Sequence, residues 1–125
     1  MTELPAIVVD MTSPVPPFEQ IRAQFFTLIS NGVLHRNDRL PPVRQLAADL
    51  RLAVGTTARA YRELEAAGLV RTRRGGGTRV LTSQAAPPER RAALVHERAR
   101  AFVQQARLLG ATDSDLIAAV NDVLG

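Results

Sequence analysis

The 125-residue sequence contains no cysteine and no tryptophan. Without cysteine there is no disulfide framework, no thiol nucleophile and no cysteine-ligated zinc site, so nothing in the composition requires an oxidising compartment. No stretch approaches the ~20 apolar residues of a membrane span, and residues 1–10 lack the basic start and long apolar run of a signal peptide. We therefore expect one compact domain with a short accessory segment, no membrane partner and a cytoplasmic location.

Lysine is also absent, because all 16 basic residues are arginine. A Walker-type phosphate loop requires a lysine, so the triplet Gly75–Gly77 is not expected to bind a nucleotide. Aromatic residues make up 4% of the chain, which argues against RNA binding by base stacking.

The charge is distributed unevenly along the chain. Residues 1–35 carry a net charge of −2 and residues 80–125 a net charge of zero, whereas residues 36–79 hold ten arginines against four acids, a net charge of +6. This concentration is typical of a surface that meets a polyanion. A solvated basic face with no partner is the alternative.

Candidate catalytic groups are sparse. His35 and His96 are the two histidines, and neither belongs to a zinc-binding or nucleophile–base pattern. We expect no enzymatic activity, no metal and no cofactor.

The spacing of apolar residues predicts three helices in the first half of the chain. They cover residues 17–31, about nine residues after Pro41-Pro42, and residues 54–67. The β-branched run at residues 6–9 predicts a short edge strand, and residues 35–39 are expected to form a polar turn.

Two strand candidates follow the third helix, at residues 69–73 and 78–82. The glycines of the intervening Arg74-Gly75-Gly76-Gly77 permit the positive φ that a hairpin turn needs. Three helices and a hairpin predict a mainly α fold with a small β-hairpin, a winged helix-turn-helix. In this architecture the third helix enters the DNA major groove and the hairpin reaches an adjacent groove or the backbone.

Two further amphipathic helices are predicted after the hairpin, at residues 89–109 and after the Thr112/Asp115 capping box. Their apolar stripes cannot be buried by two helices alone. A second copy of the chain and packing onto the winged helix would both cover them, and we favour the second copy because a two-fold dimer supplies paired reading heads. The expected dimerisation residues are Val95, Phe102, Val103, Leu109, Leu116, Ile117 and Val120.

Short motifs follow one another in order along the chain: Pro17-Phe18-Glu19-Gln20-Ile21, Gly32-Val33-Leu34, Asp38-Arg39-Leu40-Pro41-Pro42-Val43-Arg44-Gln45-Leu46-Ala47, Ala60-Tyr61-Arg62-Glu63-Leu64-Glu65, Gly68-Leu69-Val70 and Gly75-Gly76-Gly77-Thr78. The series resembles the GntR family of bacterial transcription regulators over residues 7–82. Ile7-Val8-Val9-Asp10, Ser13 and the short tail resemble its YtrA-type branch. The resemblance implies a winged-helix DNA-binding domain (1–82), a linker (83–88) and a helical dimerisation segment (89–125), acting as a homodimer on a palindromic operator, usually as a repressor.

The resemblance also indicates which residues contact double-stranded DNA. Arg44 matches a family arginine, and its guanidinium suits guanine or phosphate. Thr56 matches a contact threonine in the first turn of the recognition helix, and Gly75 matches the glycine at the wing tip. The resemblance gives Arg44, Thr56 and Gly75 as DNA-binding residues. Position and charge add Thr57 in the same helical turn, Arg59 at an exposed position, and Arg73, Arg74 and Arg79 near the wing tip.

Some positions depart from the family pattern. Ala53, Val54, Gly55 and Ala58 replace residues that are polar in some members, so base reading is expected to involve fewer hydrogen bonds. Two other hypotheses stay open. In one, the winged helix is a protein-interaction module; in the other, the regulator also responds to a small-molecule effector.

Overall fold

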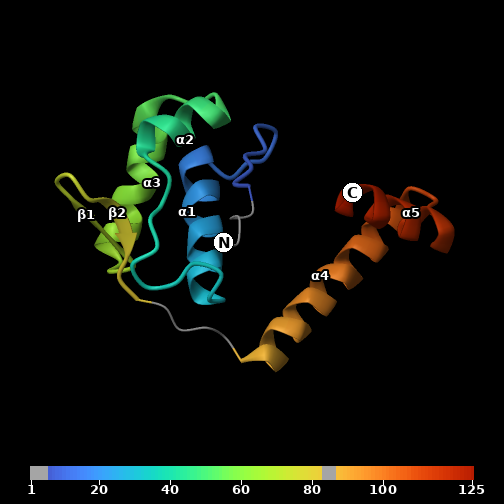
Figure 1. The fold of residues 1–125 in the computed structure, drawn as a ribbon. Helices are drawn as coiled ribbons and strands as arrows, with labels where there is room; N and C mark the ends of the chain where they lie inside the picture. Colours follow the sequence, from blue (N-terminus) through green and yellow to red (C-terminus); the bar gives the residue numbers. More distant parts are fainter. Residues whose placement is uncertain (1–5, 83–86) are drawn as a thin grey trace. The chain divides into compact units, whose positions relative to one another are not determined.

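The chain divides into two units, Met1–Ala86 and Pro87–Gly125. The structure is a computed structural model that describes residues 6–82 and 87–125 (Figure 1). Most of the expected linker, residues 83–86, lies outside the described residues, and its last residue, Pro88, is the first residue of a helix.

Three helices form the body of the first unit: α1 (Pro17–Ser30), α2 (Val43–Leu50) and α3 (Val54–Ala66). The observed bounds of the three helices agree with the predicted ranges to within about a residue. Proline starts α1 well, because its fixed φ suits the first helical position and the missing N–H has no helical partner to lose. Between α2 and α3, Arg51 adopts the left-handed conformation, with φ 57° and ψ 44°, and closes the helix-turn-helix.

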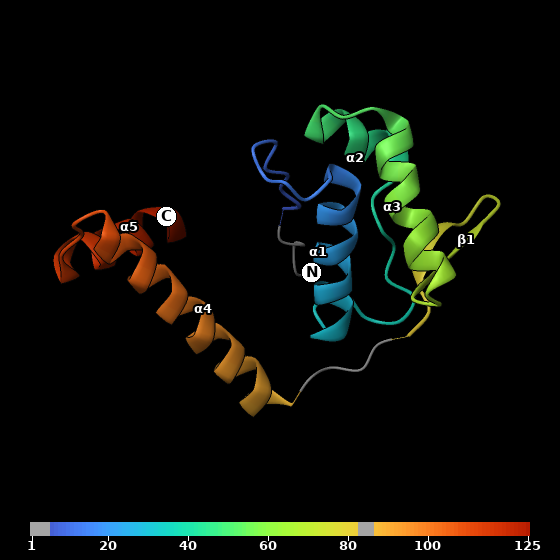
Figure 2. The ribbon, with the colours of Figure 1, turned by 180° about the vertical axis from the view of Figure 1, so that it is seen from behind.

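The hydrophobic core lies where α1 packs against α3 (Figure 2). Ile21 and Phe25 from α1 and Leu64 from α3 are completely buried. The Phe25 and Tyr61 rings meet edge to face, with their centroids 5.6 Å apart. The Tyr61 hydroxyl donates a 2.6 Å hydrogen bond to the Pro41 carbonyl, just before α2, and burial raises the pKa of Tyr61 well above its usual value.

The predicted hairpin is present as β1 (Val70–Arg73) and β2 (Gly77–Val80), paired antiparallel. Val70 and Val80 face the core, together with Thr78, and the Thr72 and Thr78 hydroxyls share a 2.8 Å hydrogen bond. Because side chains alternate along a strand, the opposite face is left to arginines.

The expected polar turn at residues 35–39 is only partly a turn. Its end pairs with the free edge of β2: the Leu40 N–H donates to the Thr78 carbonyl, and the Val80 N–H donates to the Asp38 carbonyl. An isolated bridge joins Arg39 to Arg79. Asn37 in this turn has φ 73°, a left-handed conformation that asparagine adopts more readily than most residues.

The predicted edge strand at residues 6–9 is wrong. The segment lies along α1 without a strand partner, because a side chain supplies the hydrogen bonds instead. The Gln24 amide accepts a bond of 3.0 Å from the Val8 N–H and donates one of 2.6 Å to the Val8 carbonyl.

The second unit consists of α4 (Pro88–Leu108) and α5 (Asp113–Leu124). The predicted capping box at the start of α5 is confirmed: the Thr112 hydroxyl accepts the Asp115 N–H, and the Asp115 carboxylate accepts the Thr112 N–H, which lowers the pKa of Asp115. Arg107 and Asp113 form an ion pair between the helices. Within the described part of the chain, none of the helices is long and apolar enough to cross a bilayer.

Candidate nucleic-acid interface

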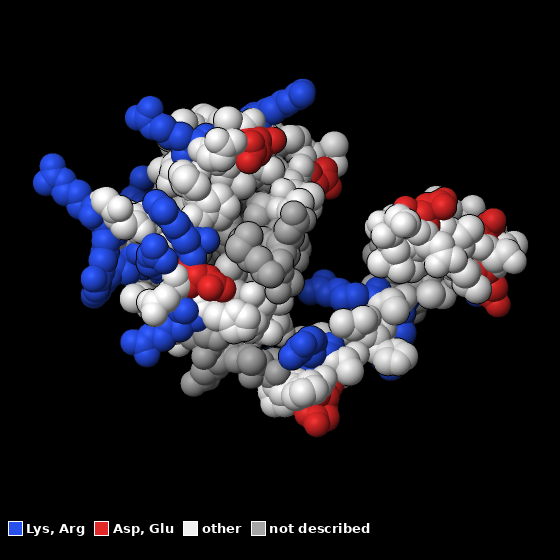
Figure 3. Space-filling view, in the orientation of Figure 1, with Lys and Arg blue, Asp and Glu red and all other residues white. Residues whose placement is uncertain are grey.

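All ten arginines of residues 36–79 are exposed. Figure 3 shows many of them gathered on the side of the first unit where the wing and the helix-turn-helix lie. Among residues 6–82 and 87–125, the ion pairs involve Arg22, His35, Arg59 and Arg107. The arginines of α2 and of the wing therefore have no carboxylate partner in the described residues, and their charge is available to an external anion.

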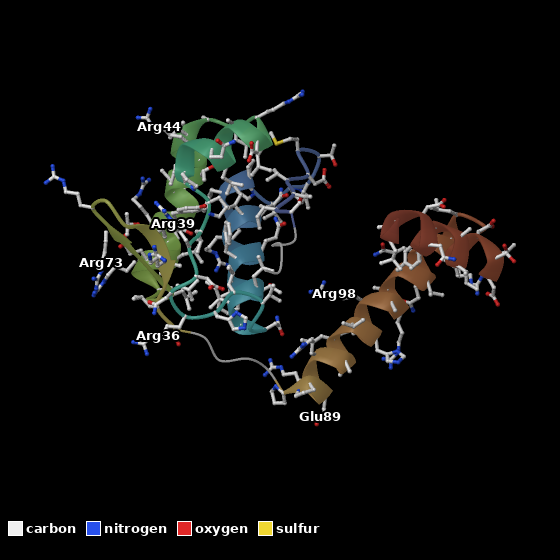
Figure 4. All side chains as sticks on the ribbon, in the orientation of Figure 1. Arg36, Arg39, Arg44, Arg73, Glu89 and Arg98 are labelled. Atoms are coloured by element: carbon white, nitrogen blue, oxygen red, sulfur yellow. The ribbon has the colours of Figure 1, made fainter. Side chains whose placement is uncertain are left out.

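Arg44 is the second residue of α2 and is exposed, with its side chain directed away from the core (Figure 4). The Tyr61–Pro41 hydrogen bond fixes the chain three residues before Arg44. This anchor fixes the backbone from which Arg44 projects, and the five N–H donors of its exposed guanidinium remain available to a ligand.

The first turn of α3 is open to an anion. Its N-cap residue is Ala53, and no side chain caps the helix. Uncapped N–H groups and the positive end of the helix dipole favour a phosphate at this position. Gly55 is exposed and Thr56 is half-buried, so both backbone and hydroxyl donors lie at the surface.

Thr57 does not lie on this surface, and its predicted contact with DNA is corrected. The residue is completely buried, and its hydroxyl has no hydrogen-bond partner among the described residues. The reason is helical spacing: Thr57 shares the inward face of α3 with Ala60, Tyr61 and Leu64. That spacing was readable in the sequence, so burial was predictable.

Arg59 is held by two neighbours. Its guanidinium carbon lies 3.7 Å from the centroid of the Phe18 ring, and its Nε lies 3.8 Å from the Glu63 carboxylate. The side chain remains 56% exposed. An exposed guanidinium beside the first turns of α3 can still contact a phosphate.

The wing presents arginines at its tip and along its strands. Arg73 and Arg74 directly precede Gly75, which has φ 80° and nothing within 4 Å of where a Cβ would stand. The tip is thus narrow enough to approach a groove closely. Arg79 lies farther down, on β2, and its guanidinium donates to the Asn37 carbonyl at 2.9 Å.

Sequence reasoning missed Arg39 and Arg71. Arg71 faces Arg79 directly across the hairpin, which the strand register would have shown. Arg39 joins the wing through the long-range pairing of residues 37–40 with β2, for which the sequence contained no local signal. In the part of the chain that the structure describes, no three His, Asp or Glu side chains cluster as metal ligands.

The predicted dimerisation residues lie on α4, on α5 or just after α4. Val95, Phe102, Leu109, Ile117 and Val120 are exposed, and Val103 is half-buried. Phe102 and Val120 line one apolar hollow of about 290 Å³ with Ala119, Val123 and Leu124. Leu116 is buried at 9% exposure inside its own unit, so it is not the exposed contact that the sequence predicted.

Comparison with known proteins identifies the family to which this chain belongs. Residues 17–80 match the pattern of the bacterial regulatory proteins of the gntR family. The chain is also 42% identical over 107 residues to the HTH-type transcriptional regulator Rv1152 of Mycobacterium tuberculosis, covering 86% of this chain and 84% of that protein. The chain belongs to the GntR family. It is a transcription regulator with a winged-helix DNA-binding domain.

Two YtrA proteins relate this GntR regulator to the branch that the sequence suggested. The HTH-type transcriptional repressor YtrA of Bacillus subtilis is 40% identical over 72 residues, which cover 58% of this chain and 55% of that protein. A solved structure of YtrA from Sulfolobus acidocaldarius, a GntR-family transcription factor, is 26% identical, with a TM-score of 0.56. The match covers 94% of this chain and 96% of that one.

Replacing Thr57 tests its assignment to the core of this GntR domain. We expect Thr57→Val to raise the free energy of unfolding by about 1 kcal/mol, because it removes a buried hydroxyl without a partner at nearly constant volume. Urea denaturation followed by circular dichroism measures the change. Its affinity for DNA should equal that of the wild type.

Thr56→Val is the matched control at the neighbouring position. It should leave the stability within about 0.5 kcal/mol of the wild type and weaken DNA binding, since the Thr56 hydroxyl lies at the surface. A loss of stability in Thr57→Val would show that its hydroxyl has a partner and would contradict the assignment.

Proposed function

We propose that the protein is a repressor that binds an inverted-repeat operator as a homodimer in the bacterial cytoplasm. The observation that carries the proposal is the uncapped first turn of α3, with arginines that lack carboxylate partners on both sides of it, on α2 and on the wing. Membership of the GntR family and the similarity to the B. subtilis repressor YtrA support it.

The first turn of α3 would enter the major groove. Arg44 would place its guanidinium fork on a guanine edge or a phosphate, and the helix N-terminus with Thr56 would bind the backbone. Arg73, Arg74 and Gly75 at the wing tip would approach an adjacent minor groove, where arginine senses groove width. Since Ala53, Val54, Gly55 and Ala58 offer no side-chain donors, Arg44 and DNA shape would supply most of the sequence preference.

The second unit would form the homodimer. Leu116 is its buried residue, whereas Val123 and Leu124 are 87% and 79% exposed beside the apolar hollow. Two helices of this size bury too little apolar surface to be stable alone. A second copy presents the same face and covers both hollows at once, which a two-fold contact allows. The two winged-helix domains of the dimer would then match the two halves of an inverted repeat. A dimer bound over a promoter would exclude RNA polymerase.

Arg44→Ala tests the proposed contact between α2 and the DNA. We expect the variant to lose about 1–3 kcal/mol of binding to the DNA upstream of its own gene, because one bidentate contact disappears. Fluorescence anisotropy on that duplex and on a shuffled duplex, from low to ~200 mM salt, measures affinity and sequence preference together.

Arg91→Ala removes the same charge from α4 and should bind both duplexes as the wild type does. Equal affinity of Arg44→Ala and the wild type for the upstream duplex would contradict the proposed contact. Absence of DNA binding by the wild type would instead favour a protein-interaction module.

Val120→Asp tests the dimer. A carboxylate in the apolar hollow cannot be buried without a partner, so the variant should be monomeric. Light scattering should give the wild type twice the 13.6 kDa mass of the chain. The variant should show the single mass and weaker operator binding. Ala118→Asp places the same charge at another exposed position of α5 and should remain dimeric. Dimers in both variants would exclude this face as the interface.

A further inference from the structure

The start of α3 presents an apolar surface that the core does not use. Val54, the first residue of α3, is 47% exposed, whereas Leu52, two residues earlier, packs against the core. Ala53 and Gly55 on either side of Val54 are exposed and carry no polar side-chain atoms. Valine is also a weak helix former, because its branched side chain is restricted in a helix. Neither core packing nor helix propensity therefore explains a valine at this position.

Val54 lies on the side of α3 that faces the wing. Val54 and Ala58 are four residues apart and Glu65 follows seven residues later, so the three side chains share one face of the helix. The Glu65 carboxylate accepts the Thr72 N–H at 3.0 Å, which places this face beside β1. The opposite side of α3 contacts α1, as Figure 2 shows. Val54 and Ala58 therefore form a short apolar stripe next to the wing.

Small neighbours allow the start of α3 to approach a base closely. A Cβ on Gly55 would meet nothing within 4 Å, and the side chain of Ala58 is a single methyl group. Arg44 and Arg73, whose side chains are long, project from α2 and the wing instead (Figure 4). A helix with small residues at its start can lie deep in the major groove, where a short valine side chain reaches the edges of the bases.

The chemistry of valine limits what it can recognise there. Its side chain has no donor or acceptor, so it cannot pair with the nitrogen and oxygen atoms that most base edges display. The apolar group by which the major groove distinguishes one base from the others is the 5-methyl group of thymine. Any other base would leave a polar edge against the valine without a partner.

We propose that Val54, with Ala58 beside it, is a specificity-determining residue that recognises one thymine in each half of the operator through the thymine methyl group. The inference rests on the proposed function and adds an apolar contact to the preference that Arg44 and DNA shape supply. The contact buries two apolar groups together, so it does not depend on charge.

The experiment removes the thymine methyl group and nothing else. Each thymine of the upstream duplex is replaced in turn by deoxyuridine, which keeps the base pair and the O4 acceptor. Fluorescence anisotropy measures the affinity of the full-length protein for each duplex. We expect the wild type to lose about fourfold in affinity at one thymine of each half-site, because burial of one methyl group contributes about that much.

Three variants assign the contact to Val54. Val54→Ala should bind the unmodified duplex more weakly than the wild type and show less than about a twofold response to deoxyuridine at the same thymine, since the methyl group has lost its partner. Val54→Ile keeps the apolar contact and should keep the response. Val8→Ala removes the same atoms from a 66% exposed position in the segment along α1, and it should respond as the wild type does. Circular dichroism checks that all three fold.

A response to deoxyuridine that disappears in Val54→Ala alone supports the inference. A response that Val54→Ala retains assigns the methyl contact to another residue and overturns it. A wild type that prefers the upstream duplex to a shuffled one but responds to deoxyuridine at none of the thymines also overturns it, and the proposed function then stands. A wild type that binds the upstream and shuffled duplexes alike contradicts the proposed function and the inference together.

Discussion

The packing of α1 against α3 is the interaction on which the rest of the first unit depends. Ile21, Phe25 and Leu64 are fully buried there, and Tyr61 extends from the same contact to the Pro41 carbonyl. Through this hydrogen bond the core also fixes the chain that enters α2. The start of α2, the first turn of α3 and the base of the wing are therefore positioned by one apolar cluster, and none of them needs a ligand to take its place.

Arginines remain without carboxylate partners because residues 36–79 hold ten arginines against four acids. The backbone that carries them is held by buried contacts and by the pairing of residues 37–40 with β2. The repulsion that results is an intrinsic cost to folding, and a polyanion removes it on binding. The same unpaired arginines thus lower the stability of the first unit and raise its affinity for phosphate.

The sequence predicted what depends on local periodicity. Helix ranges followed from apolar spacing, the hairpin from its glycines, and the α5 cap from Thr112 and Asp115. Features that depend on distant partners were missed: the pairing of Arg39 with β2 and the hydrogen bonds from Gln24 that hold residues 6–9. Thr57 is a different case, because its spacing from Ala60, Tyr61 and Leu64 predicts burial, while its place in the first turn of the helix suggested a DNA contact. The exposed stripes of α4 and α5 were predictable, but burial of Leu116 required knowing how the two helices meet.

The central claim is that one face of the first unit, formed by α2, the start of α3 and the wing, meets DNA. The most direct measurement is the change in backbone amide chemical shifts of the isotope-labelled full-length protein when the upstream duplex is added. The account predicts large changes around Arg44, in the first turn of α3 and along the wing, with small changes in α4 and α5. Changes confined to α4 and α5, or spread evenly over the chain, would contradict it.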